Sequence, residues 1–350
     1  MDNKPLVSIC IPNYNYGHYL EHCLESVLQQ TYPNIEVLFS DNNSTDNSYE
    51  IAYSYKKKFE EKGVYFHLNN NKRNVGSDTN SRIASQKSEG EFIYTLASDD
   101  AINPEFIEKC ISIFEQYPSV GMVMTNREEI DENGAVSKQV PFYNTSCIIN
   151  GEDQAAVFMM AGIAIPAQRM ARRSIISKTH LYQRKWNVAG DWYDNFLCSC
   201  FGDVAYLKDD LVQYRVHTGN ETNESEKTLL GIFEHYQLIN AFVDVAKSCG
   251  LQKPVLRYNE AVEHLGDMCL RYTVRMLGDN QFEAAKRYIL LAPVMKPQIV
   301  ENDQYIQLKE IVNLTDYAEV RRRMLEFKER NNMNRTKSYD PPVGYTPLMF

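Results

Sequence analysis

The chain has 350 residues, of which 43% are hydrophobic and 24% are charged. This composition is ordinary for a globular protein and allows one large domain or two smaller ones. The formal net charge of -9 argues against a general nucleic-acid-binding protein, because such proteins need clustered positive charge.

Short apolar runs alternate with helical patterns through the first part of the chain. The apolar runs, which are rich in β-forming residues, lie at 6–11, 35–39, 64–68, 92–97 and 120–124. Helical patterns follow the first four of these runs, at about 20–28, 46–62, 78–88 and 104–117. This alternation predicts an α/β fold, with a largely parallel sheet covered by helices on both faces.

The eight cysteines are scattered, and none stands in a CxxC pair. No apolar run reaches the roughly 18 residues that span a bilayer. We therefore expect reduced, buried thiols and a cytoplasmic protein. Peripheral contact with the inner face of the membrane stays open.

Two adjacent acids, Asp99 and Asp100, end the apolar run at 92–97. Neighbouring carboxylates at the end of a buried strand repel each other and lose hydration, so a divalent cation that carries a diphosphate is the simplest compensation. The alternative is that Asp100 caps the following helix. Asn103 and Pro104 already provide an N-cap and a first-turn proline there.

Polar residues also end two other predicted strands, at 13–15 and 41–46. Because the carboxyl ends of parallel strands meet at one edge of a sheet, we expect these residues to lie near Asp99 and Asp100. Neither GxGxxG nor GxxxxGK[ST] occurs in the strand–helix turns, which argues against dinucleotide and P-loop sites. A strand-end acid, a stacking tyrosine and a cation suit a nucleotide sugar. The alternative for Asp41 is an Asx-turn residue; for Asp46 we accept the role of helix cap.

The segment at 7–15, VSICIPNYN, resembles the start of family 2 glycosyltransferases of the GT-A fold. Further motifs of that family are matched, in order, at 20–33, 41–46, 74–80 and 90–93. The resemblance covers about residues 5–217. It implies a metal-dependent, inverting transfer of a sugar from a nucleotide-sugar donor, with a UDP-sugar as the first choice. The acceptor would be a saccharide, a lipid-linked saccharide or a protein or peptide side chain.

The resemblance also implies a donor site. Its nucleotide-binding residues would be Pro12, Tyr14, Asp41, Asn74 and Asp99. Tyr14 would stack on the base, Asp41 would accept from the base, and Asp99 would hold the ribose. Asp100 would bind Mn²⁺ or Mg²⁺ at the diphosphate, and His217 would complete the metal site unless it is a structural histidine. Ala97 replaces the first acid of the family's D-x-D motif.

The family places its general base at the position of Asp191, which begins a predicted helix. Inverting displacement of a nucleoside diphosphate needs one carboxylate that deprotonates the acceptor and one cation that stabilises the leaving group. The alternative is that Asp191 only caps its helix.

The last third of the chain has helical patterns at 226–248, 254–277, 281–292 and 303–330. We expect a GT-A domain at 1–220, a helical domain at 221–330 and a flexible tail at 331–350. The helical domain would recognise the acceptor or form a homodimer. Two other functions have less support in the sequence. A nucleotidyltransferase lacks support because no glycine-rich phosphate loop is present, and a non-catalytic assembly protein with a degenerate nucleotide-binding domain is favoured only by Ala97.

Overall fold

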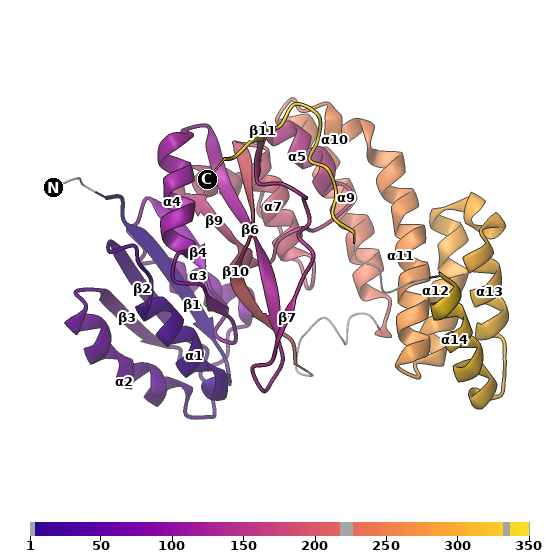
Figure 1. The fold of residues 1–350 in the computed structure, drawn as a ribbon, viewed down its shortest axis with the longest axis horizontal. Coiled ribbons are helices and arrows are strands. Elements are labelled where there is room, and N and C mark those ends of the chain that lie inside the picture. The colour runs from indigo at the N-terminus through magenta and orange to yellow at the C-terminus, as the bar shows by residue number, and fades with distance from the viewer. Residues whose placement is uncertain (1–3, 218–226, 332–336, 350) are drawn as a thin grey trace.

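One mixed β-sheet organises the N-terminal part of the chain (Figure 1). The computed structural model describes residues 4–217, 227–331 and 337–349. Within these residues the strands lie in the order β11-β8-β10-β6-β9-β4-β1-β2-β3, with β5 beside β10 and β7 beside β6. The strand bounds are β1 Val7–Asn13, β2 Ile35–Asp41, β3 Tyr65–Asn70, β4 Phe92–Thr95, β5 Ala101–Ile102, β6 Val120–Ile130, β7 Val136–Lys138, β8 Cys147–Ile149, β9 Arg169–Arg172, β10 Asp203–Arg215 and β11 Thr346–Pro347.

Helices cover both faces of this sheet and continue beyond it. The helices up to β10 are α1 Gly17–Leu28, α2 Ser48–Glu61, α3 Ser77–Ser85, α4 Phe106–Gln116, α5 Gly151–Phe158, α6 Arg173–Thr179 and α7 Gly190–Ser199. Short 3-10 helices are η1 Pro166–Gln168, η2 His180–Tyr182 and η3 Pro297–Glu301. The later helices are α9 Leu230–Ser248, α10 Lys253–Leu256, α11 Tyr258–Gly278, α12 Phe282–Met295, α13 Asp303–Val312 and α14 Tyr317–Asn331.

The half of the sheet formed by β3, β2, β1 and β4 is parallel, and its strands match the predicted ones. Strands β1 and β2 are buried along almost their whole length. Because both of their faces are covered, they appear in the sequence as continuous apolar runs. Helices α1, α2 and α4 share a core with Ile9 and Val37, whereas α3 packs against Cys10 and Leu38 on the opposite face. The predicted α/β class is confirmed.

The other half of the sheet differs from the largely parallel arrangement that we expected. Strand β9 lies antiparallel between β4 and β6, and β8 lies antiparallel beside β10. Strand β9 reads Arg-Met-Ala-Arg, which is too short and too polar to stand out as an apolar run. Because β9 runs against β4, it begins at the edge of the sheet where β4 ends. Strand β10 is parallel to β6, so its carboxyl end reaches the same edge.

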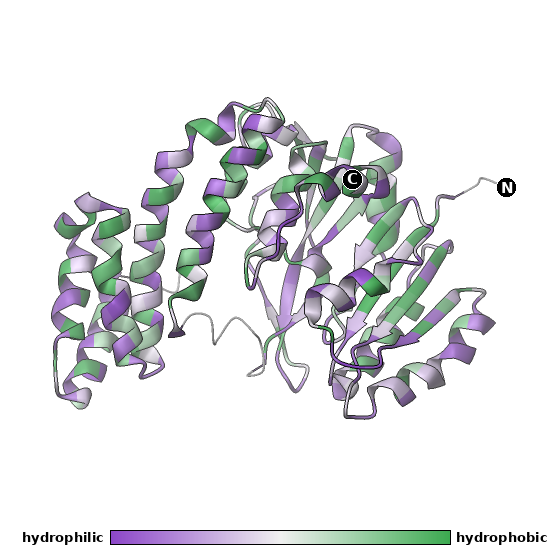
Figure 2. Cartoon of the chain, turned by 180° about the vertical axis from the view of Figure 1, so that it is seen from behind, coloured by the Kyte–Doolittle hydropathy of each residue, from purple (hydrophilic) through white to green (hydrophobic). Residues whose placement is uncertain are grey.

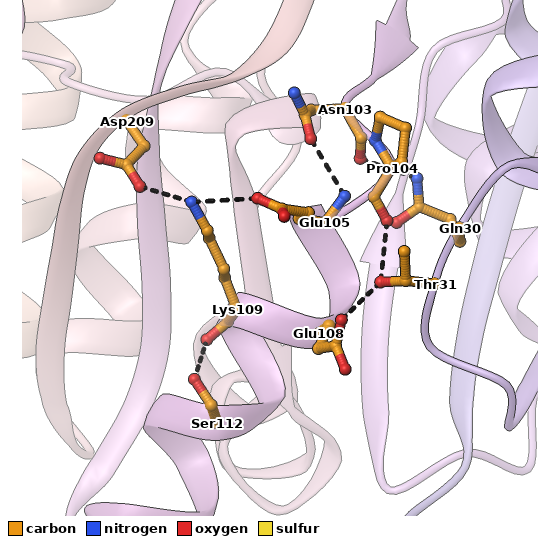
Figure 3. Close-up of polar contacts among 9 residues, drawn as sticks. All are labelled: Gln30, Thr31, Asn103, Pro104, Glu105, Glu108, Lys109, Ser112 and Asp209. Atoms are coloured by element: carbon orange, nitrogen blue, oxygen red, sulfur yellow. Dashed lines mark hydrogen bonds and ion pairs between the residues drawn. The ribbon is translucent and has the colours of Figure 1, made fainter. Parts of the chain in front are cut away.

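The start of α4 is held by Asn103, three residues after the paired acids (Figure 3). Asn103 Oδ1 accepts a hydrogen bond from Glu105 N at 3.0 Å, and the Asn103 carbonyl accepts from Gln30 Nε2 at 2.8 Å. The next carbonyl, of Pro104, accepts from Thr31 N at 3.0 Å. Asn103 thus holds a turn ahead of the helix, but the predicted cap is wrong: α4 begins at Phe106, and its N-cap position is Glu105. The carboxylate of Asp100 is left to contact other elements.

The helices α9 to α14 extend away from the sheet, and their hydrophilic and hydrophobic bands alternate (Figures 1 and 2). One hydrophobic core runs from β6 and α7 through α9 to α14. The single helix predicted at 303–330 is wrong: α13 and α14 are separate, and Asp316 Oδ1 accepts from Ala318 N at the start of the second. The expected boundary at 220 lies outside the described residues. No helix in the described part of the chain is long and apolar enough to cross a membrane.

Residues 337–349 lie along the edge of the sheet, which corrects the expectation of a flexible tail for this stretch. Strand β11 pairs with β8, so that Thr346 lies opposite Ile148. Leu348 N donates to the Ser146 carbonyl at 2.9 Å, and Asn144 Nδ2 donates to Asp340 Oδ1 at 2.5 Å. The polar composition of the tail hid this pairing, because an edge strand of two residues has no apolar pattern of its own.

Candidate active site

The carboxyl ends of β1 and β2 meet at the edge of the sheet, as the sequence predicted. Asn13 lies opposite Asp41, and Asn13 Nδ2 donates to Asp41 Oδ1 at 2.8 Å. Ser44 N and Ser44 Oγ also donate to this carboxylate, at 2.8 and 2.7 Å. Asp41 is 1% exposed, whereas Tyr14, which follows β1, is 42% exposed. Asp41 therefore anchors the turn at 42–44, which was the alternative interpretation, and the Tyr14 side chain is partly exposed to solvent.

Pro12 and Asp46 shape the same edge. Pro12 is the penultimate residue of β1 and lies opposite Ser40 of β2. Asp46 Oδ2 accepts from Gly17 N at 2.9 Å, while its Oδ1 accepts from Ser48 N at 3.0 Å. One carboxylate thus ties the starts of α1 and α2 together, although the N-cap position of α2 is Asn47 and not Asp46 as predicted.

Asparagine side chains continue the edge toward β3. Asn74 Oδ1 accepts from Asn42 Nδ2 and from Gly76 N, both at 2.9 Å. Asn42 Oδ1 in turn accepts from Val75 N at 2.9 Å. Gly76 has a φ of +86°, a conformation that favours glycine, and α3 begins directly after it. Asn74 therefore fastens the loop before α3 to the end of β2.

The two adjacent acids face different surroundings. Asp99 Oδ2 lies 3.1 Å from His217 Nε2, and these side chains are 12% and 7% exposed. Asp100 is 2% exposed, and its Oδ1 accepts from the backbone N–H of Arg215 at 2.9 Å. Burial first, and then the Asp99 carboxylate, raise the pKa of Asp100 well above its usual range. We expected His217 beside Asp100, but the described structure brings it to Asp99.

Arg215, at the end of β10, holds this turn from three directions. Its Nε donates to the Asp99 carbonyl at 2.9 Å, and its Nη1 donates to the Asp131 carbonyl at 2.8 Å. Its Nη2 lies 3.0 Å from His22 Nδ1, and its guanidinium lies 4.3 Å from the centre of the Tyr19 ring. No role was expected for Arg215 from the sequence. Its position two residues before His217 was the available signal.

A cleft of about 710 Å³ opens beside Arg215. It lies between the start of α1 and the turn from β6 to β7, and its polar lining includes His18, His22, Asn133, Gln213 and Arg215. The guanidinium of Arg215 thus lies between a solvent-filled space and the turn that carries Asp99.

Asp191 lies in the first turn of α7 and is exposed. Burial lowers the pKa of the nearby Arg169 guanidinium, but Asp194, Cys198 and Asp191 outweigh burial and raise it. Arg169 Nη2 also contacts Asp194 Oδ2 at 3.1 Å. Arg169 begins β9 at the edge where β4 ends, and its guanidinium is close enough to Asp191 for the two charges to interact.

Arg127 and Gln168 connect the two groups of acids. Arg127 Nη1 donates to Gln168 Oε1 at 2.9 Å, and the guanidinium of Arg127 lowers the pKa of Asp100, against the larger effect of burial. Gln168 Nε2 donates to the Thr125 carbonyl at 2.8 Å, and Gln168 directly precedes β9. The guanidinium of Arg127 and the amide of Gln168 thus connect the surroundings of Asp100 to the start of β9. Arg127 did not stand out in the sequence, because nothing local marks it.

The donor atoms at this edge fit a cation that is also held by a ligand. Among residues 4–217, 227–331 and 337–349, no group of three or more His, Cys, Asp or Glu side chains could hold a metal ion by itself. Asp99 and His217 nevertheless bring one carboxylate oxygen and one imidazole nitrogen within 3.1 Å. Mg²⁺ commonly takes one or two protein ligands and completes its shell with phosphate oxygens and water, so this donor set suits a cation that arrives with a diphosphate.

Comparisons with known proteins identify the family of this chain. Residues 8–179 match the family Glycosyl transferase family 2. An uncharacterized glycosyltransferase of Nostoc sp. is 30% identical over 254 residues, which cover 68% of this chain and 75% of that protein. An uncharacterized glycosyltransferase of Rickettsia typhi is 36% identical over 239 residues, which cover 67% of this chain and 70% of that protein.

A solved structure shares the fold. The crystal structure of S. aureus TarS 1-349 in complex with UDP-GlcNAc superposes with a TM-score of 0.59 and 15% sequence identity. The superposition covers 99% of this chain and all of the solved one. The fold is thus of the GT-A type that the sequence motifs predicted, and its helical C-terminal region is included in the likeness. With the family match and the relatives in Nostoc and Rickettsia, this chain belongs to glycosyltransferase family 2.

Proposed function

We propose that this glycosyltransferase transfers a sugar from a UDP-sugar to an acceptor hydroxyl, with inversion and with the help of a divalent cation. The single observation that carries the proposal is the contact between Asp99 and His217 at the carboxyl edge of the sheet. The UDP and UDP-GlcNAc complexes of the TarS structure support the choice of nucleotide. Pro12, Tyr14 and Asp41 lie at the carboxyl ends of β1 and β2, and Asn74 follows β3, so they line the same edge of the sheet as this pair.

The donor nucleotide would lie over the ends of β1, β2 and β3. Tyr14 would stack on the uracil, since its ring is 42% exposed. Asp41 is buried, so its part is to fix the turn at 42–44 and, through Asn13, the backbone next to Tyr14. Asn74 would hold the neighbouring loop, and Pro12 would keep the end of β1 in its extended form.

Mn²⁺ or Mg²⁺ would be held by Asp99 and His217, which differs from our expectation that Asp100 would be the carboxylate ligand. The near-complete burial of Asp100 and its hydrogen bond from Arg215 N support this reassignment. When bound, the cation would neutralise the charge that develops on the leaving UDP. Asp100 and Arg215 would hold the turn that presents Asp99.

Asp191 would be the general base. Its position in the first turn of α7 favours the charged carboxylate, because the N-terminus of a helix stabilises negative charge. The acceptor oxygen would form its bond to the anomeric carbon as the bond to the diphosphate oxygen breaks, and the acceptor proton would pass to Asp191. The acceptor would be a saccharide, a lipid-linked saccharide or a peptide side chain. The helical region would contribute to its recognition or to a homodimer.

Calorimetric titration of UDP with and without Mn²⁺, with GDP as the comparison, tests the donor site. We expect binding of UDP that strengthens with Mn²⁺ and is tighter than binding of GDP. UDP release from a panel of UDP-sugars then tests the base: Asp191→Asn should leave only a small residual rate of release and keep UDP affinity unchanged. Absence of binding to either nucleotide would favour the non-catalytic alternative, and full turnover of Asp191→Asn would rule out Asp191 as the base.

A further inference from the structure

Glu234 of α9 reaches across to the residues that lead into α7. Its Oε1 accepts from Asn187 N at 2.6 Å and from Asn187 Nδ2 at 3.1 Å. Its Oε2 accepts from Val188 N at 2.6 Å and from Ala189 N at 3.2 Å. Glu234 is 4% exposed, so these four hydrogen bonds form away from solvent. One buried carboxylate from the C-terminal helical region therefore holds three consecutive backbone N–H groups just before Asp191.

The chemistry of this contact requires a carboxylate. Ala189, the residue before α7, has no side-chain acceptor with which to cap the helix. Successive backbone N–H groups, such as those of residues 187–189 just before α7, form a concave site of positive potential, which suits an anion. A glutamine at position 234 would supply one acceptor oxygen and one donor group, and the donor would face N–H groups that are themselves donors.

Aromatic contacts continue the same connection between α9 and α7. The Trp192 ring lies 5.1 Å from the His235 ring, and Trp192 Nε1 donates to the Phe158 carbonyl at 2.6 Å. One turn further along α7, Phe196 stacks on Phe242 of α9 at 4.0 Å between ring centres. Trp192 directly follows Asp191, so these contacts fix the rotation of α7 about its axis.

We propose that Glu234 is a positioning residue, which sets the orientation of the Asp191 carboxylate through the backbone at 187–189. The inference rests on the proposed function, in which Asp191 is the general base. It assigns to the C-terminal helical region a part in the chemical step, in addition to any contact with acceptor or partner. Misplacement of a reacting group by about 1 Å can cost about 100-fold in rate, so loss of this contact should lower kcat by about 10- to 100-fold.

The test uses the full chain and three single variants. Glu234→Gln removes the second acceptor oxygen, and Glu234→Asp keeps both oxygens on a shorter side chain. Asp244→Asn is the matched control, because Asp244 is also on α9 and contacts Arg184 of the same loop, at 3.3 Å, but in solvent. For each variant we would measure kcat and KM for UDP release from UDP-GlcNAc, or from the UDP-sugar with the highest rate. Calorimetric UDP affinity, thermal unfolding and amide hydrogen exchange over 183–193 would complete the set.

We expect kcat to fall in the order wild type, Glu234→Asp, Glu234→Gln, with UDP affinity unchanged within about twofold and with faster amide exchange over 183–193. The control should match the wild type. A folded Glu234→Gln with wild-type kcat would overturn the proposal, and so would a loss of UDP affinity in parallel with kcat. If Glu234→Gln does not fold, wild-type kcat in Glu234→Asp together with faster exchange would overturn it equally.

A double variant separates this proposal from the proposed function. Glu234→Gln should have no further effect on residual UDP release in the Asp191→Asn background, because both changes act through the same carboxylate. Full turnover of Asp191→Asn would refute the proposed base. A strongly impaired Asp191→Asn whose residual rate falls further when Glu234→Gln is added would refute only the positioning role of Glu234.

Discussion

Replacement of Arg215 by lysine tests whether the network under Asp99 is built on a guanidinium or only on a positive charge. Arg215 is 4% exposed, and its side chain bonds two backbone carbonyls and one imidazole nitrogen in different directions. Lysine keeps the charge but carries it on a single nitrogen. Lysine can therefore bond at most one of these three partners, and it loses the contact of the planar guanidinium with the Tyr19 ring.

The magnitude follows from the two lost hydrogen bonds. A hydrogen bond from a charged donor contributes about 1.5–3 kcal/mol, and a buried acceptor that loses its partner costs about 1–3 kcal/mol. We expect Arg215→Lys to lower the free energy of unfolding by about 3 kcal/mol. Because one lost partner is the carbonyl of Asp99, the orientation of the Asp99 side chain toward His217 should loosen as well. Mn²⁺-dependent UDP binding should then weaken by about tenfold.

Urea unfolding and calorimetry measure the two effects on the same samples. Arg173→Lys is the control: Arg173 bonds the Gly90 carbonyl at 2.6 Å and Ser88 Oγ at 3.1 Å, away from the carboxyl edge of the sheet. It should lose stability and keep its UDP affinity. An unchanged urea midpoint for Arg215→Lys would refute the stated role of the guanidinium. An equal loss of UDP affinity in both variants would refute its link to Asp99.

Three further predictions concern the metal ligands, a buried histidine and the tail. Asp99→Ala and His217→Ala should each remove the Mn²⁺ dependence of UDP binding. Asp100→Ala should chiefly lower the free energy of unfolding, by about 1–3 kcal/mol, because it leaves the buried N–H of Arg215 unpaired. Loss of Mn²⁺ dependence only in Asp100→Ala would restore Asp100 as the metal ligand, as assigned from the sequence. Burial lowers the pKa of His235 from 6.5 to about 4. Between these pH values the histidine is protonated in the unfolded chain and neutral in the folded one, so the free energy of unfolding should fall by about 3 kcal/mol as the pH drops from 6.5 to 4. Urea unfolding of His235→Phe should lack this part of the pH dependence, and identical pH profiles would refute it. Truncation after residue 336 removes the strand that covers β8, so light scattering should show more self-association than in the full chain; an unchanged monomer would argue against that covering role.

The strands and helices of the parallel half could be predicted because their signal is local. A strand buried on both faces must be apolar along its length, as β1 and β2 are, and an amphipathic helix repeats its apolar positions every three or four residues. The grouping of the polar residues at the strand ends could also be predicted, because parallel strands bring their carboxyl ends to one edge of the sheet. Asn13 and Asp41 therefore lie side by side as expected, and the family motifs on these strands led to the correct family and fold.

Other features depend on partners far away in the chain. Strand β9 has no apolar pattern, because its place in the sheet comes from pairing with β4 and β6 on either side. Nothing in the sequence distinguishes Asp99 from Asp100. In the structure Asp99 contacts His217, whereas Asp100 is buried and accepts a hydrogen bond from the backbone N–H of Arg215, more than a hundred residues later. In the sequence Glu234 is an ordinary acidic residue of a predicted helix, and only the packing of α9 on α7 gives it its backbone partners. The sequence by itself determined which segments are strands and helices and which edge of the sheet carries the polar groups, because burial and periodicity act within a segment. Only the tertiary structure decided which acid meets the histidine and what supports Asp191, because these contacts join segments whose approach no local pattern records.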